Sequence, residues 1–272
     1  MTGHMTSCGY GFPSRFRCGA LVLTAATGLL AGCTQFGPAE RESLRQASQL
    51  YSRDDFPGAT ARLDRLIADH GQAVEIGEAH YVRGLCRLRA GQERPAMEDL
   101  KQAIDRSHRS DLTAYARASL AAIYHRQGYW TQAANLYADA LPALPAQPPK
   151  DTILFSAGVA LQRAGRWRDA TMCFSELLRV FRDRPIAAQA RQKGQWRHDY
   201  FAIQLGAFSE ASRAESEVRN WQRRGMDAVQ ESVPRGGQSL WVVMTGQYPT
   251  YAQAVEALKR VRTSVPDAYI IP

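Results

Sequence analysis

The fold of residues 200–272 is decided by two stretches, Ile203-Gln204-Leu205-Gly206-Ala207-Phe208 and Val243-Met244-Thr245-Gly246-Gln247-Tyr248. A shift of 40 residues superposes their glycines and their final aromatic residues. Each stretch alternates as a strand does, ends in a Gly-x-aromatic corner and precedes an amphipathic helical pattern. The duplication predicts a small sheet with both helices on one side, so that its other face is open and suits a polymer.

The alternation within the first stretch sets the direction of its side chains. Odd-numbered residues from Phe201 to Leu205 are expected to point to one face of the sheet, and Ala202, Gln204 and Gly206 to the other. The other expected elements are a helix capped by Ser209 and ended by Gly225, a strand over 226–233, a turn at 236–237, a strand over 240–245, a helix that begins at Thr250 and a last strand over 267–271. The order β-α-β-β-α-β is that of a split βαβ sandwich, an α+β fold.

The chain from 40 to 195 has a different pattern, which is helical and periodic. Gly91, Gly128 and Gly165 are spaced 37 residues apart, and one further step back reaches Asp54. Five residues beyond these positions a small residue follows each time, namely Ala59, Ala96, Ala133 and Ala170. Each unit is predicted to be a helix, a tight turn and a second helix, and such units bury their apolar faces by stacking on their neighbours.

These units resemble tetratricopeptide repeats, with Gly84, Gly158 and Ala121 at the positions of close helix contact. The first unit departs from the pattern, because Ala47 and Asp54 stand where glycines are expected. The resemblance implies about four repeats and a capping helix over 40–195, which form a groove that binds a peptide or a partner protein. The sequence does not name that partner.

The N-terminal segment has the order of an export signal. Arg15 and Arg17 precede an apolar stretch over 19–30 that is too short to span a bilayer as a stable helix. The stretch ends in Leu30-Ala31-Gly32-Cys33, which resembles the lipobox of a bacterial lipoprotein. The resemblance implies a signal peptide over 1–32, a lipid on the Cys33 thiol and a linker over 33–39. Thr34 favours the outer membrane if the cell is Gram-negative, whereas a plain secretory signal with a chance cysteine is the alternative.

Composition and reactive side chains give little indication of chemistry. The formal charge of +8 is dispersed over many helices, which favours solvated faces over a nucleic-acid site. Cys86 and Cys173 are expected on apolar helix faces as free thiols, although a disulfide between them stays open. Arg163 is as consistent with solvent exposure as with ligand contact. No Cys/His cluster or catalytic grouping is apparent, so we predict no metal, no cofactor and no enzyme activity.

The C-terminal region has a more specific resemblance. Tyr200 to Phe208, the second corner Gly246-Gln247-Tyr248 and the final stretch over 266–271 are similar to a SPOR domain, over 200–272. The resemblance implies a fold like that of RNA-recognition modules. It also implies binding of peptidoglycan glycan strands that have lost their stem peptides, across the open sheet face.

Carried over to this sequence, the resemblance predicts a glycan site at Gln204, Ala207, Leu240, Val242 and Met244. On the third strand, Trp241, Val243 and Thr245 are then expected to face the helices. Phe208 and Tyr248 are expected to be corner residues that pack into the core. The alternative is that the apolar open face is covered, either by the helix around Trp196 or by a partner.

Together these features predict a lipid-anchored protein of the cell envelope. It would bind peptidoglycan through the SPOR domain and dock a protein on its repeats, in cell division or cell-wall remodelling. The alternative is an outer-membrane scaffold lipoprotein whose sheet is a protein interface without affinity for glycan. Nucleic acid is not an expected partner, because the first and third strands lack stacking aromatic residues on their open face.

Overall fold

The computed structural model describes residues 35–235 and 238–272, which lie within one compact unit, Cys33–Pro272. The predicted signal peptide over 1–32, the predicted lipid site Cys33 and the predicted turn at 236–237 lie outside the described residues. Of the helices that are described, none has both the length and the apolar character that a membrane-spanning helix requires.

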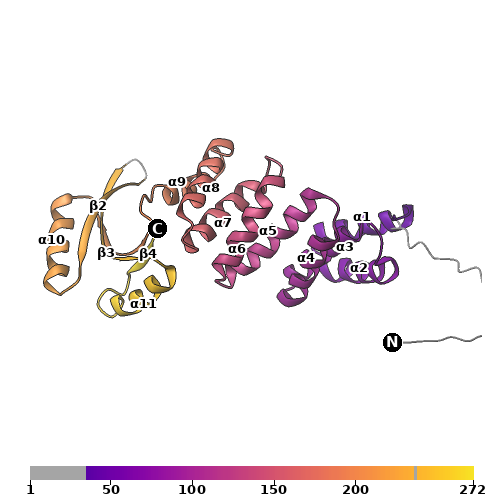
Figure 1. Cartoon of the computed structure of the whole chain (residues 1–272), viewed down its shortest axis with the longest axis horizontal. Helices are drawn as coiled ribbons and strands as arrows, with labels where there is room; N and C mark the ends of the chain where they lie inside the picture. Colours follow the sequence, from indigo (N-terminus) through magenta and orange to yellow (C-terminus); the bar gives the residue numbers. More distant parts are fainter. Residues whose placement is uncertain (1–34, 236–237) are drawn as a thin grey trace, which may run out of the picture. The chain divides into compact units, whose positions relative to one another are not determined.

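Within the described residues, the first part of the chain forms four helix pairs and a ninth helix, which follow one another as stacked hairpins (Figure 1). Their bounds are α1 Pro38–Ser52, α2 Phe56–His70, α3 Ile76–Arg89, α4 Glu93–Arg106, α5 Ser110–Arg126, α6 Trp130–Ala140, α7 Lys150–Arg163, α8 Trp167–Val180 and α9 Ile186–Gly194, with a short 3-10 turn η1, Leu141–Ala143, after α6. The predicted helical repeat array is confirmed.

The 37-residue period arises from the turn inside each pair. Gly91, Gly128 and Gly165 have φ angles of 75°, 80° and 75°, the left-handed conformation that ends a helix at lowest cost in glycine. Asp54, one period earlier, adopts the same conformation with φ 62°. Asp tolerates this region better than most residues, so the first repeat keeps the turn without the glycine.

Small residues allow the two helices of a pair to approach closely. A Cβ atom on Gly84 would lie 3.2 Å from Cβ of Asp99, and one on Gly158 would lie 2.5 Å from the ring of Phe174. Phe174 is buried, so its ring has no free space into which to move. The small residues five positions beyond each turn are fully buried, namely Ala59, Ala96, Ala133 and Ala170. The predicted close contacts at Gly84 and Gly158 are therefore confirmed.

The second part of the chain is a four-stranded antiparallel sheet with two helices. Its elements are β1 Phe201–Phe208, α10 Ala211–Arg223, β2 Ala228–Arg235, β3 Gln238–Tyr248, α11 Tyr251–Val261 and β4 Tyr269–Ile271. The strand order is β2-β3-β1-β4, which puts the first and third strands at the centre. The predicted β-α-β-β-α-β order and the α+β class are confirmed.

The helix signals in this part are confirmed with one exception. Thr250 forms a capping box with Gln253, and Gly225 ends α10 with φ 80°. The expected cap at Ser209 is wrong, because α10 begins at Ala211 and its N-cap residue is Glu210, whose side chain makes no capping bond. Strands β2 and β4 begin two residues later than expected. In each case a backbone bond closes a turn first, from Ala228 N–H to Met226 O and from Ala268 N–H to Val265 O.

Cys86 and Cys173 are buried free thiols in two different apolar clusters of the array. Burial raises the pKa of both thiols to about 11. They remain protonated at neutral pH and act as small apolar residues, as predicted.

Candidate functional site: the open face of the sheet

The two faces of the sheet have different roles. Ile203 packs with Ala257 and Val261 of α11, and Val243 packs with Ala214 and Trp221 of α10. Both helices therefore cover the same face, which confirms the predicted direction of Ile203 and Val243. Among the described residues of this domain, neither helix lies on the opposite face.

One row of side chains crosses this open face through all four strands. Val229 pairs with Met244, Met244 with Gln204, and Gln204 with Tyr269, and residues paired in this way share a face. Met244 and Gln204 in the middle are 4% and 8% exposed, whereas Val229 and Tyr269 at the edges are 47% and 39% exposed. The row is thus a shallow depression with an apolar residue at each rim.

The two glycine corners are explained by contact with the aromatic residues that follow them. A Cβ atom on Gly206 would lie 3.0 Å from the ring of Phe208, and one on Gly246 would overlap the ring of Tyr248. Phe208 and Tyr248 pack against the apolar clusters under the helices. Their predicted role as corner residues is therefore confirmed.

The expected direction of Gly206 is wrong. The pairing of β1 with β3 shifts between Gln204 and Gly206, which marks a β-bulge. Beyond the shift, Gly206 pairs with Val243 on the helix side, and Ala207 pairs with Val242 on the open face. A bulge shifts by one residue the alternation of side chains between the two faces, and the apolar pattern of the sequence gives no signal for it.

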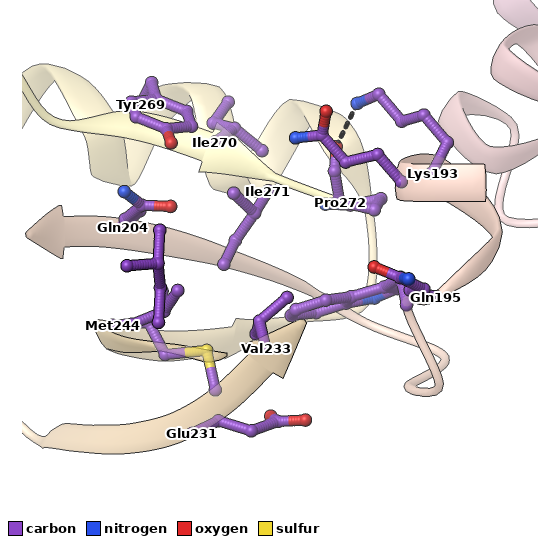
Figure 2. A pocket seen from close by; sticks show the side chains of 14 residues that line it. Lys193, Gln195, Gln204, Glu231, Val233, Met244, Tyr269, Ile270, Ile271 and Pro272 are labelled. Atoms are coloured by element: carbon purple, nitrogen blue, oxygen red, sulfur yellow. Dashed lines mark hydrogen bonds between the residues drawn. The ribbon is translucent and has the colours of Figure 1, made fainter. Parts of the chain in front are cut away.

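A cavity of about 180 Å³ lies on the open face (Figure 2). Four of the five predicted site residues line it: Gln204, Leu240, Val242 and Met244. Ala207 is exposed on the same face but does not line the cavity. The cavity is smaller than the roughly 300 Å³ at which small-molecule pockets usually begin.

One side of the cavity is formed by residues that precede the sheet in the chain, and we call these residues the wall. Lys193 at the end of α9 and Gln195 and Trp196 just after it line the cavity. Trp196 Nε1 donates to the carbonyl oxygen of Tyr200 at 2.9 Å, and the rings of His198 and Tyr200 stack with centroids 4.8 Å apart. The segment around Trp196 therefore covers one end of the face, and only the two ends of the row, Val229 and Tyr269, are exposed.

The cavity has polar groups at its edges. Lys193 Nζ donates to the main-chain oxygen of Pro272, the last residue of the sequence, and His198 Nε2 lies 2.8 Å from Glu231 Oε2. Burial lowers the pKa of Lys193 to about 8, and the positive charge of Arg163 contributes in the same direction. Arg163 is largely buried, with its guanidinium 3.6 Å from the ring centroid of Tyr251. Arg163 is therefore not a freely solvated side chain, because this ring covers part of it.

Sequence reasoning missed Lys193 and Tyr269 as residues of this site, and it named Trp196 only as part of a possible cover of the face. Tyr269 had a usable signal, because it alternates with Ile271 on the last strand and so shares a face with it. Lys193 had no such signal, since the sequence of a helix end does not indicate the strand face against which it packs.

Three comparisons with known proteins add to this geometry. A family model described as SPOR domain matches residues 198–272. A comparison with curated proteins found no match to this chain. Within the described residues, the candidate site has its sheet inside the matched region and its wall residues Lys193, Gln195 and Trp196 outside it.

Several solved structures are similar to part of the chain. A tetratricopeptide repeat protein from Parabacteroides merdae is 16% identical over 57% of this chain and 59% of its own, with a TM-score of 0.47. PilF from Pseudomonas aeruginosa is 15% identical over 56% and 65%, with a TM-score of 0.45. A thermophilic TPR protein from Thermus thermophilus is 23% identical over 56% and 78%, with a TM-score of 0.40. The match spans less than two thirds of the first two of these proteins.

Proposed function

We propose that this protein, whose residues 198–272 are a SPOR domain that follows an array of tetratricopeptide-like repeats, binds stripped glycan strands of peptidoglycan on its open sheet face. The repeats would hold a protein partner at the same place. Both parts belong to classes that act by binding, a SPOR domain on peptidoglycan and such repeats on proteins. The observation that carries the proposal is the row of Val229, Met244, Gln204 and Tyr269 across the open face.

The chemistry of this row suits an amino sugar. The Gln204 amide can both donate to and accept from hydroxyl and N-acetyl groups. Tyr269, which is 39% exposed, presents a ring on which the apolar face of a sugar can lie. Met244 and Val229 continue the row on the other side of Gln204 and make its surroundings apolar. A polymer of repeating sugar units can continue beyond the rims at either edge.

The proposed cellular setting is the cell envelope. A lipid on Cys33 would anchor the protein, with the outer membrane favoured in a Gram-negative cell, and cell division or wall remodelling would be its process. We expect incorporation of labelled palmitate into the wild-type protein and its loss in Cys33→Ala. A Cys86→Ala variant, which removes a buried thiol, is the matched control and should keep the label. Equal labelling of the wild type and Cys33→Ala would contradict the anchor.

The glycan proposal is tested by co-sedimentation with sacculi. The purified protein is expected to pellet with amidase-treated sacculi, and Gln204→Ala to bind them about five to ten times more weakly, the effect of one lost hydrogen bond of about 1 kcal/mol. Gln247→Ala removes the same side chain from an exposed corner outside the cavity and should bind as the wild type does.

Intact sacculi are the second arm of this experiment, because their stem peptides occupy the space beside the glycan. Equal sedimentation of the wild type with treated and intact sacculi, or none with either, would contradict the proposal. A Gln204→Ala variant that is folded and binds fully would remove Gln204 from the site and leave the rest.

A second candidate has one observation in its favour. The wall formed by Lys193, Gln195 and Trp196 already covers one end of the face, and an apolar sheet face can serve as an interface between protein parts. The protein would then be an envelope scaffold without glycan affinity. Failure of the wild type to sediment with treated sacculi is the result that favours this candidate.

A further inference from the structure

Two aromatic side chains line the cavity on the open face, and they come from different parts of the chain. Tyr269 lies on β4 within the row, whereas Trp196 belongs to the wall. The residues of β3 that line the cavity are Leu240, Val242 and Met244, none of which has a ring. Trp196 is half-buried, so part of its indole remains accessible from the cavity. It is the largest ring among the described residues that line this space.

The indole of Trp196 is held in one orientation. Its Nε1 donates to the main-chain oxygen of Tyr200 at 2.9 Å. The rings of His198 and Tyr200 stand at 72° and 83° to the indole plane, with centroids 4.8 and 5.9 Å away. Rotation of the side chain would break this bond and both ring contacts. The ring is therefore preorganised, and a ligand that binds to it does not have to order it first.

The segment that carries Trp196 is tied to both edges of the sheet. Lys193 Nζ donates to the main-chain oxygen of Pro272, which follows β4, and His198 Nε2 lies 2.8 Å from Glu231 Oε2 on β2. Strands β2 and β4 are the two edges of the sheet. Trp196 lies between Lys193 and His198 in the chain and lines the cavity, so its ring borders the space that a ligand on the face would occupy.

The hydrogen bond of the indole defines what the ring can offer to a ligand. Its single N–H group is used by the oxygen of Tyr200, so the apolar π-system is what remains for the cavity. A pyranose ring has a face on which C–H groups predominate, and these positively polarised hydrogens are attracted to the negative face of an aromatic ring. The hydroxyl and N-acetyl groups lie around the rim of the sugar and remain available to Gln204.

We infer that Trp196 is a sugar-binding residue of this face and that its indole stacks on one pyranose ring of the glycan. The inference rests on the proposed function and adds a contact from outside residues 198–272, the region that matches the SPOR family model. Tyr269 and Trp196 then contact the same strand of glycan at two places. The segment that joins the sheet to the repeats is thus part of the glycan site.

The test observes each tryptophan separately. The full protein is prepared with fluorotryptophan at its five tryptophan positions and titrated with soluble glycan strands that have been fully digested with amidase. Fluorine NMR resonances are assigned by replacing one tryptophan at a time with phenylalanine. We expect the Trp196 resonance to shift as the strands saturate the protein. The remaining tryptophans are internal controls whose resonances should stay in place, namely Trp130, Trp167, Trp221 and Trp241.

Affinity and the sugar protons give two further readouts. Trp196→Leu keeps an apolar side chain without the ring and should bind the strands about five to ten times more weakly in titration calorimetry. Trp196→Phe keeps a ring and should lose less. In the wild-type complex, the sugar C–H protons that lie over the indole should shift upfield, and this shift should be absent with Trp196→Leu.

Trp241→Leu is the matched control variant. It removes the same ring from the side of β3 that packs under α10 and should bind the strands as the wild type does. A circular dichroism spectrum checks that each variant is folded, and the fluorine spectrum of the wild type does not depend on any variant for its result.

The possible results separate the inference from the proposed function. Binding in calorimetry with an unchanged Trp196 resonance overturns the inference and leaves the proposed function intact. A shifted Trp196 resonance without upfield-shifted sugar protons also overturns it, because the segment then moves without carrying the sugar. No binding of the strands by the wild type contradicts the proposed function, and the inference falls with it.

Discussion

Replacement of Asp99 by alanine is expected to destabilise the repeat array by about 3 to 5 kcal/mol, the usual effect of removing one partner from a buried ion pair. Asp99 is 1% exposed on α4. It accepts from Arg83 Nη2 at 2.6 Å, from Arg87 Nη1 at 2.8 Å and from His80 Nδ1 at 3.2 Å, all on α3. Without the carboxylate, the buried positive charge of Arg83 loses the partner that compensates its desolvation.

Asp64 supplies the control for this variant. It contacts the same two arginines, with Arg83 Nη1 at 2.7 Å, but its side chain is 49% exposed. An exposed ion pair contributes about 0 to 1 kcal/mol, so Asp64→Ala should have a small effect. Urea unfolding followed by circular dichroism at 222 nm measures both variants. Equal losses for Asp64→Ala and Asp99→Ala would contradict the argument from burial.

The Asp99 carboxylate also makes the stability of the repeat array depend on pH under acidic conditions. Burial alone would raise the pKa of Asp99, but hydrogen bonds from His80 and Arg83 outweigh it and hold the pKa below its ordinary value of 3.8. Because the folded pKa lies below the unfolded one, the stabilisation is present above about pH 4 and is lost as the pH falls toward the folded value. Asp99→Ala should therefore reduce the dependence of stability on pH in this acid range.

The array could be predicted from the sequence because its period comes from a local requirement. Each turn needs a left-handed residue, and glycine at Gly91, Gly128 and Gly165 marks that need directly. The network around Asp99 could not be predicted in the same way. The sequence places Arg83 and Asp99 on successive helices, but only the packing of α3 on α4 shows that the carboxylate is buried beneath the arginines.

The site was predicted in part for a similar reason. Alternation is local, so it placed Gln204, Val242 and Met244 on one face. The bulge before Gly206 and the covering segment at Trp196 depend on tertiary contacts, and apolar spacing carries no signal for either. The cover near Trp196 was an open alternative in the sequence, and the wall residues Lys193 and Gln195 appear only in the structure.

Replacement of Gly246 by alanine is expected to destabilise the sheet domain by about 3 kcal/mol. Two effects add. Gly246 has φ 76°, and a residue with a Cβ loses about 1 to 2 kcal/mol in this conformation. The new Cβ would also overlap the ring of Tyr248, and overpacking of this kind costs about 1 to 3 kcal/mol. The ring can move only by giving up its contacts with the apolar cluster that contains Ile203.

Gly225 separates these two effects, because it has φ 80° and a Cβ placed there would have nothing within 4 Å. Gly225→Ala should therefore show the conformational cost alone, about 1 kcal/mol.

Adding Tyr248→Ala to Gly246→Ala should recover part of the loss, a coupling of about 1 kcal/mol between residues in contact. Thermal unfolding of the wild type, Gly246→Ala, Tyr248→Ala and the double variant measures this cycle, and Gly225→Ala is measured beside them. If Gly225→Ala and Gly246→Ala lose the same stability, the ring contact does not explain the glycine, and the Gly-x-aromatic corner is required only for its backbone. If the coupling is found, the repeated motif is a packing unit, in which each glycine leaves room for the aromatic ring that closes the end of the sheet.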